Sequence, residues 1–241
     1  MNAVDLTSYL EIVDTFENLP TPGDFTQSCH KAATLLGFEK FLFGSYLPQL
    51  GRLVIINGFP DAWRERYDEN NYIDIDPTVT HCFTQTTPLR WTDIRVDNTV
   101  AGKAVGNMME EANSFGLKDG VSVPVHGPGA ECGMMSFVSD SHVDANPVNE
   151  SLMKLAAQTI HVKIKAISVE KSVEEKTLTT RESACLRLTA AGKTSWEVSQ
   201  ILGVSESTVI FHLKNAIKKM GVCNRAQAVA KAVSLAKIKL F

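Results

Sequence analysis

The sequence predicts an α+β fold: an α/β/α sandwich with a mostly antiparallel sheet, followed by an all-α domain of four helices with a helix-turn-helix. Three observations support this fold class. Apolar segments of strand length come in adjacent pairs, with turn residues such as Pro128 and Gly129 between them. Helix-capping signals follow one another in the last 64 residues. Charge changes at the same boundary, because residues 176–241 hold 11 Lys and Arg against 3 Asp and Glu, whereas residues 1–175 hold 13 against 24.

The elements of the first domain follow from hydrophobic periodicity. Helices are expected where apolar residues recur at helical spacing, and strands where short apolar runs are bounded by turn residues. The expected strands cover residues 41–47, 52–57, 121–125 and 132–139, and the expected helices cover residues 6–17, 25–36, 61–70, 76–84, 99–115 and 148–167.

A linker is expected between the two domains. Residues 168–177, with the sequence SVEKSVEEKT, are charged and lack large apolar side chains. We therefore expect a first domain over residues 1–168, a linker over 169–177 and a second domain over 178–241. The length of 241 residues with 44% hydrophobic content is enough for one sizeable core and a small helical module.

Two capping boxes mark helix starts in the second domain. Thr179 with Glu182, and Thr194 with Glu197, have the spacing at which a hydroxyl and a carboxylate satisfy free amides in a first helical turn. The second helix is short, and after a brief turn Ser205 can cap a third helix that runs to about residue 220. This order predicts that the third helix reads a DNA groove.

The third helix and the charge together predict DNA binding. Apolar residues 209, 213, 217 and 220 share one buried face, which leaves polar and basic residues, Asn215 and Lys219 among them, on the other sides. A compact domain with a net charge of +8 favours phosphate through counterion release, whereas the acidic first domain repels it. The alternative is that these lysines only make a small domain soluble. The expected DNA contacts are Thr194, Ser195, Ser207, Thr208, Ile210, Phe211, Lys214 and Lys218.

The last helix predicts a homodimer. It is expected over residues 225–237 behind an Asn224 cap. Small residues share one of its faces and permit close packing against a second copy of the helix. These residues are Ala226, Val229, Ala230, Val233 and Ala236.

A second functional region lies within residues 58–91. Aromatic side chains with polar tips gather there beside Asp76, Thr78 and Arg64. A ligand cavity is mostly apolar with a few convergent hydrogen-bonding groups, so this composition suits one. The alternative is that the aromatic residues only fill a core. The aromatic residues are Trp63, Tyr67, Tyr72 and Trp91.

The chain resembles the LuxR family of acyl-homoserine-lactone-responsive quorum-sensing regulators over nearly its whole length. The stretch AWRERYDENNYIDIDPTVTHC is particularly similar to LasR-like members. LTTRE, GKTSWEVSQILGVSESTV and HLKNAIKKM resemble the DNA-binding half of the family. Six hallmark positions of the ligand domain match in order, and they are Trp63, Tyr67, Asp76, Pro77, Trp91 and Gly120.

The resemblance implies the role of each pocket residue. The Trp63 indole would donate to the lactone carbonyl, and the Asp76 carboxylate would accept the amide N–H of the ligand. Thr78 and Ser136 would add hydroxyl contacts, and Arg64 would reach a 3-oxo group on a medium to long chain, directly or through water. Tyr67 and Trp91 would enclose the lactone ring. The acyl tunnel would be lined by Leu42, Gly44, Tyr46, Val121, Cys132 and Met134.

Two positions depart from the family pattern. Phe59 stands where LasR-like relatives often have a tyrosine, so a hydroxyl to the acyl carbonyl is missing and Ser136 would act alone. Ile210 stands at a position of the reading helix that is commonly Lys or Asn, so a polar base contact is missing. Ile210 and Phe211 would instead touch thymine methyl groups.

Other function classes are less consistent with the sequence. The five cysteines are odd in number and form no C-x-x-C pair, and no histidine spacing presents a metal site, so we expect reduced thiols, no metal and no enzyme. A Cys/His hydrolase of acyl lactones and a ligand-independent regulator of the same fold are the alternatives. Residues 1–16 lack the features of a signal peptide and no membrane segment is evident, so we expect a cytoplasmic protein.

Overall fold

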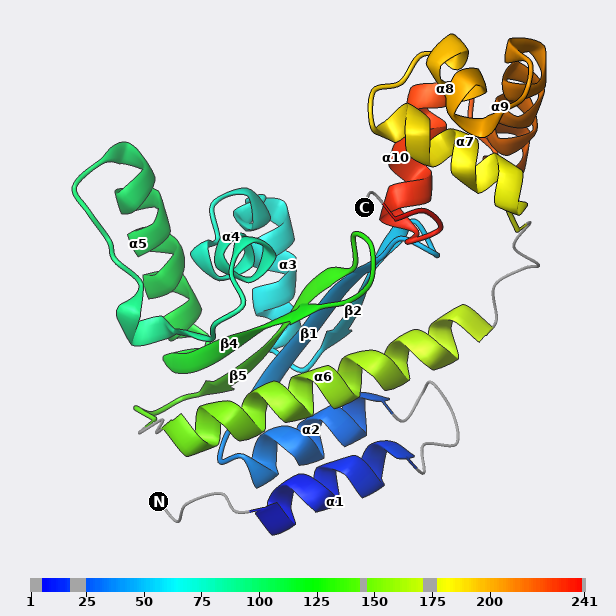
Figure 1. The fold of residues 1–241 in the computed structure, drawn as a ribbon. Helices are drawn as coiled ribbons and strands as arrows, with labels where there is room; N and C mark the ends of the chain where they lie inside the picture. The colour runs from blue at the N-terminus through cyan, green and yellow to red at the C-terminus, as the bar shows by residue number, and fades with distance from the viewer. Residues whose placement is uncertain (1–5, 18–24, 144–146, 171–176, 240–241) are drawn as a thin grey trace. The chain divides into compact units, whose positions relative to one another are not determined.

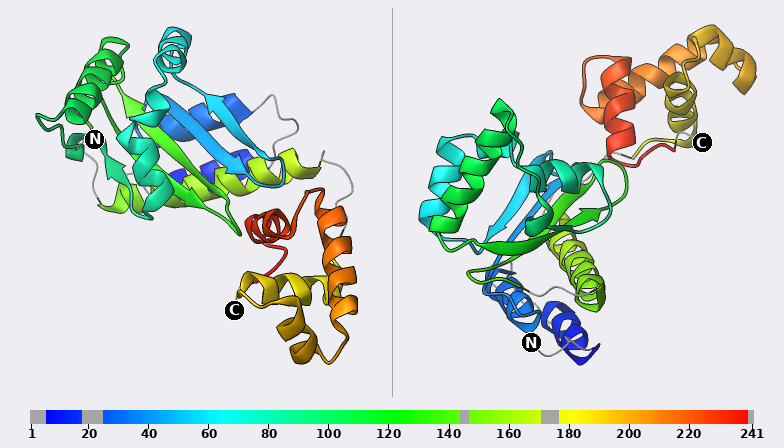
Figure 2. Two further views of the ribbon diagram at one scale, coloured as in Figure 1. Left: turned by 90° about the horizontal axis from the view of Figure 1, so that it is seen from above. Right: turned by 90° about the vertical axis from the view of Figure 1, so that its left-hand side faces the viewer.

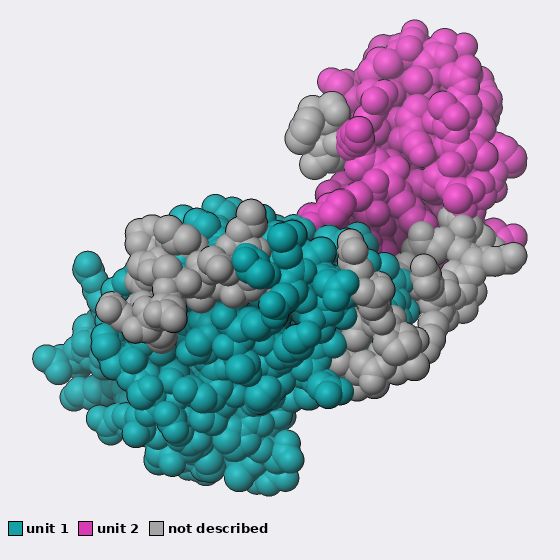
Figure 3. Space-filling view, turned by 90° about the horizontal axis from the view of Figure 1, so that it is seen from below, with its two compact units in different colours: residues 1–47, 52–126, 132–171 teal, residues 48–51, 127–131, 172–241 magenta. Residues whose placement is uncertain are grey.

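The computed structural model describes residues 6–17, 25–143, 147–170 and 177–239. The chain divides into two compact units, one made of residues 1–47, 52–126 and 132–171, and the other of residues 48–51, 127–131 and 172–241 (Figure 3). No helix in the described part of the chain is long and apolar enough to cross a bilayer.

The first unit is built on a five-stranded antiparallel sheet with the order β2-β1-β5-β4-β3. The strands are β1 (Lys40–Leu47), β2 (Arg52–Asn57), β3 (Leu89–Arg90), β4 (Asp119–His126) and β5 (Cys132–Ser139). This confirms the expected antiparallel sheet. The two-residue strand β3 was not expected, because so short a segment carries no alternation that periodicity could detect.

Three helices cover one face of the sheet, as Figures 1 and 2 show: α1 (Leu6–Glu17), α2 (Phe25–Leu35) and α6 (Pro147–Glu170). The main core lies between them and the strands, where Phe41, Phe43 and Phe137 are fully buried. Alternation along β1 sends Phe41 and Phe43 into this core and leaves Leu42 and Gly44 on the opposite face. That opposite face is the one on which the candidate site lies.

The other face of the sheet is covered by a second set of helical elements (Figure 1). They are α3 (Asp61–Glu69), η2 (Tyr72–Asp74), α4 (Pro77–Thr84), η3 (Trp91–Asp93) and α5 (Val100–Ser114). A second, smaller cluster of buried residues joins α3, α5 and the end of β5, with Trp63, Met108 and Val138 among its members. The sheet is therefore sandwiched between two helical layers, as predicted.

The second unit contains α7 (Thr180–Ala190), α8 (Ser195–Leu202), α9 (Glu206–Met220) and α10 (Arg225–Ser234). Both predicted capping boxes form, at Thr179 with Glu182 and at Thr194 with Glu197. The Ser205 hydroxyl accepts from the Thr208 amide and caps α9. Helices α8 and α9 end at Gly203 and Gly221, whose φ angles of 64° and 63° suit glycine.

Two predicted boundaries are wrong. Helix α6 runs through Glu170 rather than ending at residue 167, so it takes in the first residues of the expected linker; residues 171–176 lie outside the described part. Helix α10 ends at Ser234 rather than near residue 237, and Ala236 has a φ of 54°, which no α-helix accommodates.

The small-residue face expected on α10 is also divided. Ala226 and Ala230 are exposed, but Val229 and Val233 are half-buried against the core of the second unit. Ala236 lies beyond the end of the helix. The helix turns Ala228 and Ala232 inward, so the valines beside them are drawn into the core and only part of the predicted face reaches the surface.

Candidate functional site

A hollow of about 910 Å³, part of it open to solvent, lies between the sheet and helices α3, α4 and α5. Most of its lining is apolar, with a few polar groups among the apolar ones. The lining residues are Leu42, Gly44, Leu53, Ile55, Phe59, Trp63, Arg64, Tyr67, Ile73, Asp76, Thr78, Val79, Phe83, Trp91, Met108, Met109, Ala112, Met134 and Ser136.

Strand register explains the floor of the hollow. Leu42 pairs with Ser136 and Gly44 with Met134, and all four residues line the face away from the main core. Tyr46 and Cys132 also share this face. They pair with each other two residues beyond Gly44 and Met134, and neither lines the hollow.

The expected tunnel residue Val121 lies on the wrong face of the sheet. It is buried in the main core with Val123, two residues along the same strand. Successive residues of a strand point to opposite faces, so it is Ser122 that points toward the face with the hollow. The Val121 side chain therefore packs in the main core instead of lining the hollow.

Aromatic side chains form the wall of the hollow at α3. The rings of Trp63 and Tyr67 are 5.9 Å apart in an edge-on arrangement, and Tyr72 stacks at 5.9 Å from Trp63. Trp63 is only 5% exposed. Its indole N–H has no hydrogen-bond partner among the described residues, so it remains available as a donor toward the hollow.

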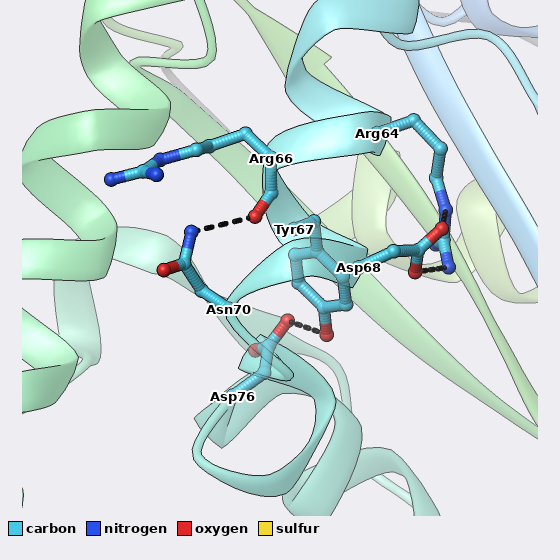
Figure 4. A network of polar contacts seen from close by, with 6 residues as sticks. All are labelled: Arg64, Arg66, Tyr67, Asp68, Asn70 and Asp76. Atoms are coloured by element: carbon cyan, nitrogen blue, oxygen red, sulfur yellow. Dashed lines mark hydrogen bonds and ion pairs between the residues drawn. The ribbon is translucent and has the colours of Figure 1, made fainter.

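Asp76 is held at the start of α4 by three hydrogen bonds. Its Oδ1 accepts from the Thr78 amide at 2.8 Å and from the Thr78 hydroxyl at 2.7 Å. Its Oδ2 accepts from the Tyr67 hydroxyl at 3.0 Å (Figure 4). Burial raises the pKa of Asp76, and the hydrogen bonds from Thr78 and Tyr67 oppose that rise. A carboxylate oxygen accepts more than one hydrogen bond, so Oδ2 can accept a further donor from the hollow.

Arg64 is fixed beside the same wall. Its guanidinium forms a two-point ion pair with Asp68, one turn further along α3, and lies over the Tyr67 ring at 5.2 Å (Figure 4). The pair uses Nε and one terminal nitrogen. Because guanidinium carries five N–H donors, it retains donors for a polar group in the hollow.

A chain of hydrogen bonds runs beneath the hollow from Trp91. Its indole Nε1 donates to Ser122 Oγ at 3.0 Å, and Ser122 Oγ lies 2.8 Å from Ser136 Oγ. Gly120 makes room for this arrangement, since a Cβ there would lie 2.6 Å from the Phe137 carbonyl oxygen and 3.4 Å from the Trp91 ring. Of the three hydrogen-bonded residues Trp91, Ser122 and Ser136, only Trp91 and Ser136 line the hollow.

A polar cluster joins α5 to α3 and η2 at the edge of the hollow. Glu111 Oε1 accepts from Arg66 Nε at 2.6 Å, and its Oε2 accepts from the Tyr72 hydroxyl. These hydrogen bonds, that from Tyr72 most strongly, hold the pKa of Glu111 below its ordinary value. We call Arg66, Tyr72 and Glu111 the α5 latch, because they tie the helix that carries Met108 and Met109 to the aromatic wall.

Most of the pocket residues expected from the sequence line the hollow together. The exceptions are Tyr46, Val121 and Cys132. Eight lining residues were not expected, and alternation along β2 and the apolar face of α5 were the signals that could have found five of them. The eight are Leu53, Ile55, Ile73, Val79, Phe83, Met108, Met109 and Ala112.

The cysteine and histidine groups considered for catalysis have structural contacts. His81 Nε2 lies 2.8 Å from the Thr87 carbonyl, and His126 Nε2 lies 2.9 Å from that of Gln85. Burial raises the pKa of the Cys82 thiol to about 12, so it is not a thiolate near neutral pH. Among the described residues no cluster of three metal-ligating side chains occurs.

In the second unit, the expected DNA contacts lie on the surface of α8 and α9. Ile210 is 41% and Phe211 is 60% exposed, and Lys214 and Lys218 are exposed on the same helix. Thr194, Ser195, Ser207 and Thr208 lie at or near the amino-terminal ends of α8 and α9. Exposed residues on the reading helix are the ones that can reach a groove.

Lys219 differs from the other lysines of α9. Its Nζ lies 2.7 Å from Oε2 of Glu182, which is 3% exposed and also accepts from the Thr179 amide. Burial would raise the pKa of Glu182, but hydrogen bonds from Lys219 and Thr179 outweigh it and keep the pKa below its ordinary value. Lys219 therefore ties α9 to α7 instead of facing solvent as expected.

Comparison with known proteins finds similarity over both units. Residues 21–164 match the autoinducer binding domain, and residues 176–232 match the luxR family of bacterial regulatory proteins. The transcriptional activator protein VanR of Vibrio anguillarum is 35% identical over 232 residues, which cover 93% of this chain and 95% of VanR. The quorum sensing-dependent transcriptional regulator RpaR of Rhodopseudomonas palustris is 33% identical over 235 residues, 96% of this chain and 95% of RpaR. The crystal structure of Escherichia coli SdiA matches 98% of this chain and 100% of that chain, with a TM-score of 0.76 at 25% identity.

Proposed function

Because the chain belongs to the LuxR family of transcriptional regulators with an autoinducer-binding domain, we propose that its hollow binds an N-acyl-homoserine lactone and thereby controls DNA binding. The observation that supports this ligand most is the order of polar groups along one apolar hollow. Trp63 offers only a donor, Asp76 offers only acceptors when ionised, and Ser136 offers a hydroxyl. An acyl lactone has the complementary order of acceptor, donor and acceptor.

We assign each part of the proposed ligand to one side of the hollow. The lactone carbonyl accepts from Trp63, the amide N–H donates to Asp76, and the amide carbonyl accepts from Ser136. The acyl chain lies over Leu42, Gly44 and Met134, where each buried methylene contributes about 0.8 kcal/mol. Arg64 is the donor for a 3-oxo group, since its pair with Asp68 leaves N–H groups unused. A 3-oxo ligand of medium to long chain suits this set of groups.

The second unit supplies the DNA-binding activity. Its net charge of +8 over residues 176–241 and the exposed residues of α9 support insertion of that helix into the major groove. We infer a homodimer that binds an inverted repeat, with half-sites about one helical turn apart. Exposed Ala226 and Ala230 on α10 remain the candidates for contact between the two copies. Because its proposed target is DNA, we expect the protein to act in the cytoplasm.

In this proposal, ligand binding is coupled to DNA binding through the stability of the folded protein. A ligand that binds only the folded protein stabilises it by about 2.7 kcal/mol at a hundredfold excess over the dissociation constant. In the proposed mechanism the lactone completes the core between the sheet and α3–α5, and the dimer that forms then presents two copies of α9 to one operator.

A panel of lactones tests the proposal. The chain is produced with each of a series of N-acyl-homoserine lactones of increasing acyl length, with and without the 3-oxo group, and thermal unfolding and operator binding are measured. The expected result is stabilisation and tighter operator binding with 3-oxo ligands of medium to long chain. Equal operator binding with every lactone and with none would favour the alternative, a ligand-independent regulator.

A further inference from the structure

We propose that Ser122, which does not line the hollow, is a positioning residue that turns the hydroxyl of Ser136 into an obligate donor toward the ligand. This inference rests on the proposed function and extends it by one residue. Ser122 is fully buried in β4 and pairs in register with Ser136 of β5. Its hydroxyl oxygen lies between the Trp91 indole nitrogen at 3.0 Å and Ser136 Oγ at 2.8 Å.

The direction of the hydrogen bonds follows from the indole. An indole N–H can only donate, so Ser122 Oγ must accept from Trp91. The Ser122 proton then has one acceptor among the described residues, Ser136 Oγ. If Ser122 donates to Ser136, the Trp91 indole proton and the Ser122 hydroxyl proton each have an acceptor.

The reverse arrangement leaves a buried donor without a partner. If Ser136 donated to Ser122, the Ser122 oxygen would accept twice and its own proton would have no acceptor in the described part of the structure. Buried polar hydrogens without partners are costly and rare. The arrangement Trp91 to Ser122 to Ser136 also leaves one proton without an acceptor among the described residues, that of Ser136. It is favoured because Ser136 lines the hollow, where water or a ligand can accept that proton, whereas Ser122 does not line it.

That proton is the one a ligand can use. Ser136 is 1% exposed and lines the hollow, and Ser122 is its hydrogen-bond partner among the described residues. A carbonyl oxygen placed there accepts the proton and completes the chain, in which each bond polarises the next. A donor placed there would meet a hydroxyl whose proton already faces it. Ser122 thus makes the site select a ligand with an acceptor at this point, the amide carbonyl of an acyl lactone.

The experiment compares side chains of matched shape at position 122. Ser122→Thr keeps a hydroxyl. Ser122→Val introduces a side chain of nearly the same shape as threonine but without the hydroxyl. The affinity of the purified full-length protein for N-(3-oxooctanoyl)-homoserine lactone is measured for wild type, both variants and Ser122→Ala. We expect about fivefold weaker binding for the Val and Ala variants, and binding within about twofold of wild type for the Thr variant.

Measurements in a Ser136→Ala background separate the proposed positioning role of Ser122 from a general packing role. In Ser136→Ala protein the hydroxyl that Ser122 positions is absent, so adding Ser122→Ala should weaken ligand binding no further. An equal loss in both backgrounds would overturn the proposal, as would equal affinity of wild type and the Val and Ala variants. A Val variant that stays unfolded at saturating lactone would assign the hydroxyl to the core and would also overturn it. Absence of lactone binding by wild type would overturn the proposed function itself, which distinguishes the two failures.

Discussion

Tyr67 donates a hydrogen bond to Oδ2 of Asp76 at 3.0 Å, while Oδ1 of the same carboxylate caps helix α4. One side chain thus has two tasks. The cap fixes the orientation of the carboxyl plane, and the phenol holds the second oxygen at the lining of the hollow. The proposed ligand anchor is pre-organised because its position is set by the start of a helix and by a ring packed against Trp63.

Asp76→Asn should weaken the lactone response at least tenfold. The amide can still accept from Thr78 through its oxygen, but its NH2 group then faces the Tyr67 hydroxyl and the ligand N–H, and a buried unsatisfied polar group costs about 1–3 kcal/mol. The dose response of a reporter gene measures the effect. Asp74→Asn, two residues away on an exposed side chain, is the matched control and should leave the response unchanged.

Ligand affinity should decrease as the pH is lowered through the raised pKa of Asp76. An N–H that donates to this carboxylate requires the ionised form, so affinity is full above that pKa and is lost as the pH falls through it, beginning above the ordinary value of 3.8. Without ligand the sign is opposite, because a carboxyl whose pKa is raised by folding contributes less stability as the pH rises. Titrations that start near neutral pH and go down to the pH at which the protein begins to unfold should show this dependence in wild type and not in Asp76→Asn.

Breaking the α5 latch should speed ligand release. Glu111→Gln keeps an oxygen for the Tyr72 hydroxyl but removes the ion pair with Arg66, so α5 is tied less firmly over the hollow. The latch is partly exposed, and such pairs are weak, so dissociation of a fluorescent or radiolabelled lactone should accelerate by no more than about fivefold. Glu110→Gln, at the exposed neighbouring position, is the control. Identical dissociation rates in all three proteins would show that the latch does not hold the ligand in place.

Lys214→Ala should weaken DNA binding and its salt dependence together. Each phosphate contact that is lost lowers the slope of log affinity against log salt by about 0.9. Lys103→Ala removes the same charge from the first unit and should change neither quantity. Footprinting and titration at several salt concentrations provide both measurements, and binding that does not vary with salt would contradict the electrostatic part of the proposal.

Phe59 and Ser136 should be coupled through the acyl carbonyl. Phe59 lines the hollow, so Phe59→Tyr adds a hydroxyl that can recover a hydrogen bond of about 0.5–1.5 kcal/mol when there is room for the oxygen. It should rescue much of the loss caused by Ser136→Ala. A double-mutant cycle on ligand sensitivity at equal protein levels measures the coupling, and strictly additive effects would show that the two positions do not serve one atom.

The helix starts of the second unit could be predicted because capping is local. Thr194, Glu197 and Ser205 are within three residues of the amides they satisfy, and the structure has α8 and α9 begin where these residues indicate. The end of α10 could not be predicted in the same way. Its last turn stops at Ser234, and residues 235–239 carry no glycine to mark the stop.

The polar contacts around the hollow depend on pairings that are distant in the sequence. Ser122 meets Ser136 only because β4 and β5 pair in a particular register, and a shift of one residue would have put Val121 there instead. Glu111 meets Tyr72 across 39 residues through the packing of α5. Periodicity indicates that a strand or helix exists, but not which neighbour each side chain will meet.

Mass spectrometry of small molecules extracted from the purified protein shows whether the hollow holds an N-acyl-homoserine lactone. Full-length wild-type and Asp76→Asn proteins are purified from cells that make N-acyl-homoserine lactones and from cells that make none, and the denatured extracts are compared. We expect about one intact acyl lactone per wild-type chain from the producing cells, and much less with Asp76→Asn. A wild-type extract without lactone, from protein that is folded and binds its operator, would contradict this expectation, as would an extract that holds only the ring-opened hydrolysis product.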